Sequence, residues 1–322
     1  MISANPNTTA CRRCGTAKPQ SAMVDGVCRR CFDSAMPISD NYFAVVIPTM
    51  GQSQFTKECF DSLVNLTGEP FSVIWIQNQH QTYRSEYERL EQEFGDKLDL
   101  RVIRNKPNNG FTRAVNQGVE LGLSGNWTHL TILNNDTKVV RNWHKRLVAQ
   151  MPYGCGLIGP LADAIDDPQN PHKTKRKLPV RWTDSDNYET FDSRLPPPSA
   201  KGFITTKVLS YCCAVIPSEI WDEVGLLDER FGHAYGEDND HSHRIRLAGY
   251  SIGIGSAVCI HHARSRTSTK ILQGEKAKRY KIGQRQQSIF KAKWADGHPP
   301  GGFPPNPTLR PWMPYSDFSY TE

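Results

Sequence analysis

Long apolar segments are missing from this chain of 322 residues. No stretch of about 18 or more apolar residues occurs, so a membrane-spanning helix is not expected. The first residues, Met1–Ala10, are polar and contain no apolar core of a secretory signal. The sequence therefore predicts a cytoplasmic protein without a membrane span.

Acidic residues are scarce in one part of the chain. Between Arg264 and Lys293 there are ten lysines and arginines but a single acid, Glu275. This segment carries a net charge of +9 and the whole chain +6, so the remainder sums to −3. Residues 173–181 form a second basic cluster without an acid. Such clusters are typical of sites for nucleotide phosphates, nucleic acids or anionic surfaces, but a solvated helix face has the same composition.

The composition is neither that of a disordered chain nor that of a fibrous one. Hydrophobic residues make up 38% of the chain and charged residues 22%, with 24 glycines, which is close to the globular norm. At roughly 150 residues per domain, the length predicts about two domains, or one large domain with an appendage.

Four of the nine cysteines lie within the first 31 residues, as two Cys-x-x-Cys pairs separated by thirteen residues. They are Cys11, Cys14, Cys28 and Cys31. This spacing can place four thiolates around one Zn²⁺. Two disulfides are the alternative, which a cytoplasmic location disfavours. We therefore predict a structural zinc ribbon, with the five other cysteines in apolar core positions.

Strands and helices alternate after a short linker. The elements predicted in the first half are the strands Phe43–Ile47, Phe71–Ile76, Leu98–Ile103 and His129–Leu133 and the helices Phe55–Leu66, Tyr83–Phe94 and Phe111–Leu123. This alternation predicts an α/β fold, a mostly parallel sheet with helices on both faces. Ligands of such sheets bind beyond the carboxyl ends of the strands, so the loops at Pro48, Gln77, Arg104 and Asn134 are candidates.

The second half is less regular. Its predicted elements are the strands Val208–Ile216 and Ser251–Ile260 and the helices Ser218–Val224, Asn239–Ala248 and Gly274–Lys293. The polar, proline-containing segment Asp163–Lys201 is long for a loop inside a domain, and such loops are usually functional or disordered. The tail His298–Glu322 contains seven prolines, which predicts an extended strap or disorder.

Three polar groups are candidates for chemistry. Asp136 follows a predicted strand and could hold a divalent cation that bridges two phosphates, although Asn-Asn-Asp is also ordinary turn sequence. Glu237, Asp238 and Asp240 begin a helix, where they either complement the helix dipole or deprotonate an acceptor hydroxyl. His261 and His262 follow a strand and are candidate metal ligands.

In this order, the motifs resemble those of the inverting family 2 glycosyltransferases with the GT-A fold. The resemblance runs from about Tyr42 to Ser268. The matching segments are Val46–Thr49, Asn108–Gly118, Leu133–Asp136, Val224–Phe231, Gly236–Asp240 and Arg244–Tyr250. Together with the cysteine spacing and the charge pattern, it predicts three segments: a zinc ribbon at 1–36, a Rossmann-like GT-A domain at 42–268, and a basic helix with a proline-rich tail at 269–322.

The resemblance also implies roles for individual residues. The nucleotide of a nucleotide-sugar donor, with a UDP-sugar as first choice, would contact Pro48, Thr49, Asn78, Arg113 and Asn134. Asp136 and one of His261 and His262 would hold Mn²⁺ or Mg²⁺ on the diphosphate. Asp238 would be the general base, with Glu237 or Asp240 as the fallback. Trp221 and Phe231 are expected in the core.

Two positions depart from the family pattern. The family often has an Asp after the second strand to read the base of the nucleotide, and here Asn78 takes its place, which could alter nucleotide choice. The position after Asp240 is usually Leu in the family, and here it is His241. We expect His241 and the nearby His243 to be solvated rather than to act as ligands.

The family does not fix the acceptor. The zinc ribbon and the basic segments favour DNA, with a sugar transferred to a hydroxymethylated base, as phage-type modification enzymes do in the host cytoplasm. The alternative is a soluble enzyme that acts on a saccharide or lipid-linked acceptor. A protein of another class, an inactive transferase domain whose zinc ribbon binds nucleic acid or protein, also remains open.

Overall fold

A computed structural model describes residues 43–162, 169, 202–232, 235–263 and 276–294, together with four short strands near the N-terminus. These strands, β1 (Thr8–Ala10), β2 (Ala17–Pro19), β3 (Met23–Val24) and β4 (Val27–Cys28), form two antiparallel pairs. The four cysteine side chains of the predicted zinc ribbon lie outside the described residues, as do the segment 170–201 and the proline-rich tail.

The first half of the large sheet is parallel. Its strands are β5 (Phe43–Thr49), β6 (Phe71–Gln77), β7 (Asp99–Arg104) and β8 (His129–Leu133). They lie in the order β8-β5-β6-β7. Every residue of β5 is buried because both faces of this strand are covered, so it reads as a continuous apolar run. The predicted strands and helices of this half are confirmed.

The second half makes the sheet mixed rather than mostly parallel. β12 (Cys213–Pro217) is inserted between β8 and β10 (Cys155–Ala162) and runs antiparallel to both. β13 (Ser251–His262) pairs parallel with β10 and antiparallel with β11 (Phe203–Thr205) and β9 (Thr137–Lys138). A buried strand has the same apolar pattern in either direction, so the sequence did not reveal this reversal.

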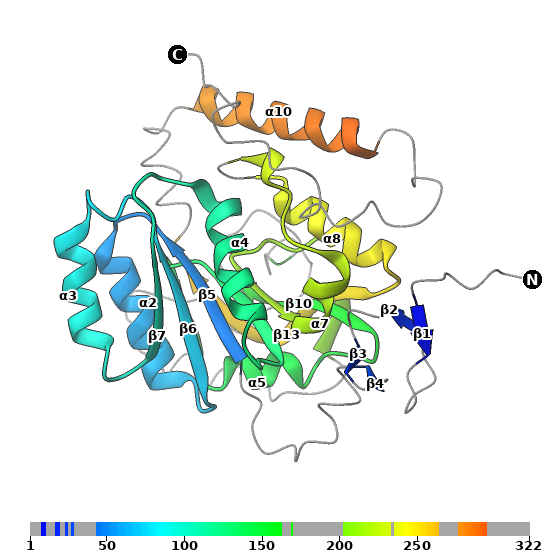
Figure 1. Cartoon of the computed structure of the whole chain (residues 1–322), viewed down its shortest axis with the longest axis horizontal. Coiled ribbons are helices and arrows are strands. Elements are labelled where there is room, and N and C mark those ends of the chain that lie inside the picture. The colour runs from blue at the N-terminus through cyan, green and yellow to red at the C-terminus, as the bar shows by residue number, and fades with distance from the viewer. Residues whose placement is uncertain are drawn as a thin grey trace, which may run out of the picture.

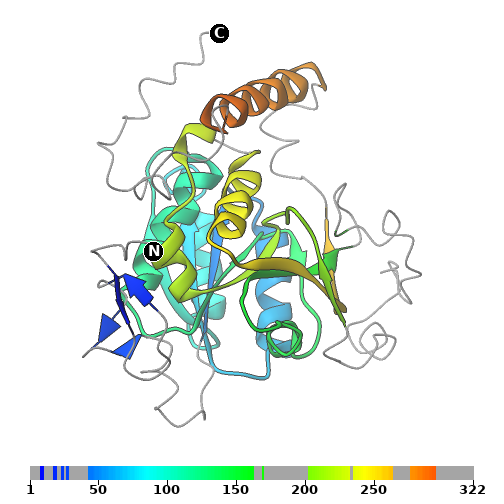
Figure 2. The same cartoon turned by 90° about the vertical axis from the view of Figure 1, so that its right-hand side faces the viewer.

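Helices cover both faces of the sheet (Figure 2). One face carries α2 (Ser53–Leu66), α3 (Arg84–Phe94) and α5 (Trp143–Val148), and the other carries α4 (Gly110–Leu123), α7 (Ser218–Val224) and α8 (Glu237–Leu247). On the first face Phe60 meets Trp75 edge-on, with 5.2 Å between ring centroids. On the second, a Cβ at Gly118 would lie 2.4 Å from Val46, so only glycine allows this approach of α4 to β5.

The basic helix predicted at Gly274–Lys293 is observed as α10 (Lys276–Trp294). It lies across α8 at the top of the view in Figure 1. The Gln286 side chain of α10 donates a hydrogen bond to the carbonyl of Phe231, at the end of the short 3₁₀ helix η3 (Glu229–Phe231). The C-terminal helix therefore packs on the α/β body. None of the helices within the described residues is long and apolar enough to cross a membrane.

Some elements of the second half differ from the predictions. The predicted strand Val208–Ile216 begins only at Cys213. β9, β10, β11 and α5 were not predicted. β10 was missed because Gly156, Gly159 and Pro160 interrupt its apolar pattern.

Candidate active site

The carboxyl ends of β5 and β6 form the first part of the site. Thr49 is the last residue of β5, and its buried hydroxyl donates to the carbonyl of Ile76 (3.1 Å) and accepts from the indole of Trp75 (2.9 Å). Pro48 precedes it, and both residues are buried. The hydroxyl of Thr49 thus links the carboxyl end of β5 to that of β6.

Asn78 follows β6 and is 4% exposed. Its Oδ1 accepts from Asn105 Nδ2 (3.0 Å) and from the backbone N–H of Asn109 (3.4 Å), and its Nδ2 donates to the carbonyl of Gly110 (3.4 Å). Gly110 has φ +75°, a conformation that favours glycine. An aspartate at position 78 could not donate to Gly110, so the amide suits the turn that begins α4.

Tyr87 of α3 links the loops that follow β5 and β6, and its role was not predicted from the sequence. Its hydroxyl donates to the carbonyl of Asn78 (2.9 Å) and accepts from the N–H of Gly51 (2.8 Å). Burial raises the pKa of Tyr87 to about 12, so the phenol remains neutral and can donate. Its sequence signal was an aromatic residue at helical spacing from the apolar Leu90 and Phe94 in a charged helix.

Two further predicted nucleotide contacts are Arg113, at the start of a helix, and Asn134, at the end of a strand. Arg113 is half-buried in the first turn of α4. Asn134 follows β8, where its backbone N–H donates to the carbonyl of Cys212 (2.8 Å). Its Nδ2 lies 3.5 Å from His262 Nε2.

Asp136 and His262 come together from segments 126 residues apart. Asp136 Oδ1 lies 3.2 Å from His262 Nε2, and both side chains are less than a tenth exposed. Backbone pairing holds them: His262 of β13 is opposite Thr137 of β9, and the Ala263 N–H donates to the carbonyl of Asp136 (2.8 Å). Two protein ligands of this kind leave coordination positions of a Mg²⁺ or Mn²⁺ ion open to oxygen ligands of a substrate.

His261 belongs to a different environment. Successive side chains of a strand point to opposite faces, so His261 points away from the side of His262. It is opposite Lys138 in the strand pairing, and Lys138 forms an ion pair with Glu58 (2.7 Å). The geometry thus distinguishes the two histidines: His262 is next to Asp136. Within the described residues, no group of three or more potential metal-ligating side chains occurs.

The three acids at the start of α8 have different surroundings. Glu237 is 5% exposed, and burial together with the charge of Asp238 raises its pKa to about 8. Asp238 is half-buried, and its Oδ1 accepts from the N–H of Asn239 (2.8 Å). At neutral pH Glu237 is therefore mostly protonated.

Asp240 is fully buried and surrounded by donors. Its carboxylate accepts from Arg244 Nε (2.9 Å), Lys293 Nζ (2.8 Å) and the indole of Trp294 (3.0 Å). Lys293 also pairs with Asp228 (2.7 Å). Burial alone would raise the pKa of Asp228, but hydrogen bonds from Arg230 and the charge of Lys293 hold it well below its usual range.

His241 is buried, not solvated as expected. Its Nε2 lies 3.0 Å from the carbonyl of Gly225, which can only accept, so Nδ1 accepts from the Tyr211 hydroxyl (2.6 Å). It stacks on Trp221, with 4.5 Å between centroids. Burial lowers the pKa of His241 well below its usual value, so the ring is neutral. The core positions expected for Trp221 and Phe231 are confirmed.

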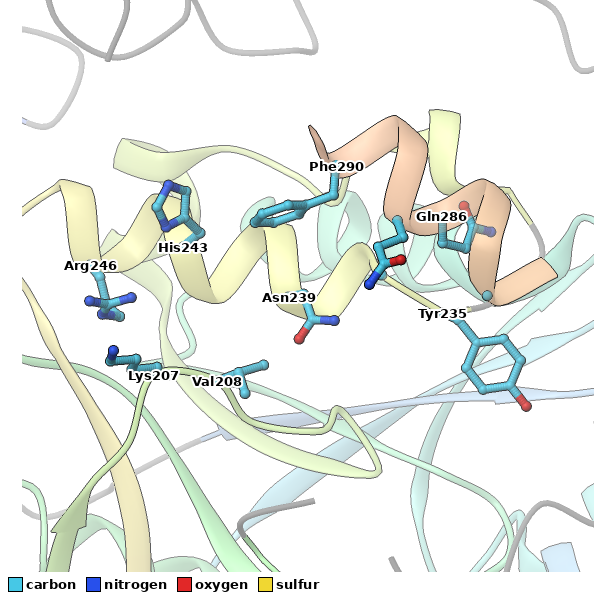
Figure 3. A pocket seen from close by; sticks show the side chains of 11 residues that line it. Lys207, Val208, Tyr235, Asn239, His243, Arg246, Gln286 and Phe290 are labelled. Carbon is cyan, nitrogen blue, oxygen red and sulfur yellow. The ribbon is translucent and has the colours of Figure 1, made fainter. Parts of the chain in front are cut away.

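A pocket of about 450 Å³ lies between α8, α10 and the segment around Lys207. Figure 3 shows Asn239 and His243 of α8 on one side and Phe290 of α10 opposite. His243 also packs edge-on against Trp294, with 4.6 Å between centroids. The sequence did not predict this pocket because its walls come from segments far apart in the chain.

The comparisons with known proteins agree with this fold. The model of glycosyl transferase family 2 matches residues 44–217, more than half of the chain. The chain therefore belongs to glycosyl transferase family 2, and it is a glycosyltransferase with a GT-A-like fold.

Individual relatives are more distant. Uncharacterized protein Rv1525 of Mycobacterium tuberculosis and Uncharacterized protein Mb1552 of Mycobacterium bovis are each 25% identical over 258 residues, covering 79% of this chain and 85% of each relative. The solved structure of GalNAc-T7 with UDP, GalNAc and Mn²⁺ aligns with a TM-score of 0.51 at 18% identity, over 70% of this chain and 44% of that chain. This chain thus spans less than half the length of GalNAc-T7, and the likeness concerns the fold alone.

Proposed function

We propose that this glycosyltransferase uses a nucleotide-sugar donor and a divalent cation, and that it transfers the sugar with inversion. The observation that carries the proposal is the Asp136–His262 pair at the end of β8. The same sheet edge carries Pro48, Thr49 and Asn78, which we assign to the nucleotide together with Arg113 and Asn134. GalNAc-T7, which has a similar fold, was solved with UDP and Mn²⁺.

Asp136 and His262 fit a Mn²⁺ or Mg²⁺ ion. One carboxylate and one imidazole, both nearly buried, are suitable donors, and the two leave room for diphosphate oxygens. When bound, the ion would neutralise the charge that develops on the departing nucleoside diphosphate. His262 is the ligand of choice over His261, because only His262 lies beside Asp136.

Asp238 is the proposed general base. It is half-buried at the start of α8, where an acceptor can reach it, and it would take the proton of the acceptor hydroxyl as that oxygen attacks C1. Glu237 is a poorer base at neutral pH because its raised pKa keeps it protonated. Asp240 is committed to Arg244, Lys293 and Trp294, so we assign it a structural role.

The acceptor we propose is a hydroxymethylated base in DNA. The basic helix α10, which packs directly on α8, supports this choice, since phosphate attraction dominates binding to nucleic acids. The proposed zinc ribbon, with Zn²⁺ on Cys11, Cys14, Cys28 and Cys31, would add a second nucleic-acid contact, and metal analysis of the purified chain tests it.

The experiment is a donor panel of nucleotide sugars, with and without Mn²⁺, against hydroxymethylated DNA, plain DNA, a simple glycan and no acceptor. Nucleoside diphosphate release that requires Mn²⁺ and rises only with hydroxymethylated DNA is the expected result. Stimulation by the glycan instead would select a saccharide acceptor. No release with any donor would overturn the proposal and favour an inactive binding domain.

A further inference from the structure

The α8–α10 pocket carries positive charge without a compensating acid. Lys207 and Arg246 line it, and none of its described lining residues is acidic. Figure 3 shows the Lys207 amine and the Arg246 guanidinium pointing toward one another from two different elements. Both side chains are exposed, and among the described residues neither forms an ion pair with a carboxylate. Two cations that face each other repel, and an anion bound between them relieves that repulsion.

Aromatic side chains line the same pocket. Tyr235 is 40% exposed, one of two exposed large hydrophobic side chains among the described residues, and it has φ +73°, an uncommon conformation for a residue with a side chain. Phe290 projects from α10 into the pocket in Figure 3 and lies 5.9 Å from the His243 ring. Cations that follow a phosphate backbone, combined with aromatic rings on which bases stack, are typical of sites for single-stranded nucleic acid.

The pocket is also adjacent to the proposed base. Gly236 and Asn239 line it, and Asp238 lies between them in the sequence. Consecutive residues of a helix are separated by about 100°, so Asp238 faces the side of α8 next to the pocket. A strand whose phosphate occupies the pocket would therefore bring the adjoining nucleotide to Asp238.

We infer that the α8–α10 pocket binds the backbone of single-stranded DNA beside the acceptor nucleotide, with Lys207 and Arg246 on a phosphate and Tyr235 and Phe290 against bases. This inference rests on the proposed DNA acceptor. It adds that the enzyme binds its DNA acceptor as a single strand, because a duplex does not offer unstacked bases to these two rings.

The test compares the salt dependence of oligonucleotide binding by fluorescence anisotropy. The double variant Lys207→Ala/Arg246→Ala should bind single-stranded DNA more weakly and show a log–log salt slope smaller by about 0.7, since both cations contact one phosphate and each phosphate contact on a single strand contributes about 0.7. The control, Arg89→Ala/Lys145→Ala, removes two exposed charges from α3 and α5 on the other face of the sheet and should bind like the wild type.

A second variant blocks the pocket without changing its charge. A Cβ at Gly283 of α10 would meet no atom within 4 Å, so Gly283→Phe should fold and fill the space. We expect it to weaken binding of single-stranded DNA while leaving the thermal midpoint unchanged. Unaltered salt slopes and affinities in both variants would overturn the inference, as would wild-type protein that prefers duplex DNA.

The two proposals fail in different ways. Donor hydrolysis by the wild type without any DNA tests the transferase chemistry and does not depend on the pocket. Wild-type hydrolysis that is stimulated by hydroxymethylated DNA, combined with unaffected DNA binding in the pocket variants, would place the DNA site elsewhere and leave the proposed function standing.

Discussion

The proposed donor side and the proposed acceptor side of this enzyme are built differently. The donor side, with β5 to β8 and α2 to α4, uses elements that follow one another in the chain. The acceptor side combines α8 with η3 and with α10, whose Lys293 binds an aspartate 53 residues earlier in the sequence. Backbone and amide hydrogen bonds fix the donor side, whereas buried charges fix the acceptor side. Substitutions on the acceptor side should therefore have the larger effects.

The largest expected effect is that of Asp238→Asn. If Asp238 removes the proton of the acceptor hydroxyl, transfer should fall by about 10² to 10⁴-fold, while donor affinity stays within a few-fold. Steady-state transfer and donor titration measure the two quantities. Glu237→Gln is the control: equal losses of transfer in both variants would contradict the assignment of the base.

Lys293→Met tests the charge cluster of the acceptor side. The lysine is 9% exposed and bridges Asp228 and Asp240, so its removal leaves two buried carboxylates with fewer partners. We expect a loss of about 3 to 5 kcal/mol in the free energy of unfolding, measured by denaturant titration. The control is Lys291→Met, an exposed residue of the same helix. Equal stabilities of the two variants would contradict a structural role of the cluster.

His262→Ala and His261→Ala form a matched pair at the junction of the two sides. The first variant should need about 10 to 100-fold more Mn²⁺ for half-maximal activity, because it removes a ligand beside Asp136. The second should behave as the wild type in the same metal titration. The reverse result would place the ion on the other face of β13.

Asn78→Asp probes the donor side. The substitution removes the amide that donates to Gly110 and introduces a charge at a site that is 4% exposed. We expect the free energy of unfolding to decrease by about 1 to 3 kcal/mol. Asn65→Asp on the exposed surface of α2 is the control. An unchanged stability together with altered nucleotide preference would instead indicate direct contact of Asn78 with the nucleotide.

Glu237 gives an effect of a different kind, a change in the pH dependence of stability. Its pKa rises from 4.5 to about 8 on folding, so the folded state binds more protons than the unfolded state between these values. Its contribution to stability is complete below about pH 4.5 and is lost as the pH rises through 8. Glu237→Gln should therefore reduce the decline of stability over this range, as thermal melts at a series of pH values would show.

The sequence predicted the donor side well because β5, β6 and β8 are buried on both faces and its helices have regular apolar spacing. It also identified Asp136 and the acids of α8 as candidates. It left the choice between His261 and His262 open, because only the pairing of β9 with β13 determines which ring faces Asp136. The buried state of His241 also depends on distant partners, Tyr211 and Trp221, which no local pattern reveals.

The contact between Asp240 and α10 has a consequence for biosynthesis. During synthesis the N-terminal residues of a chain leave the ribosome first, at about 5 to 20 residues per second. The donor side can assemble during this period, but Asp240 must keep its hydration until Lys293 and Trp294 have emerged. We therefore expect the nascent chain to acquire a nucleotide site before it acquires a completed acceptor site.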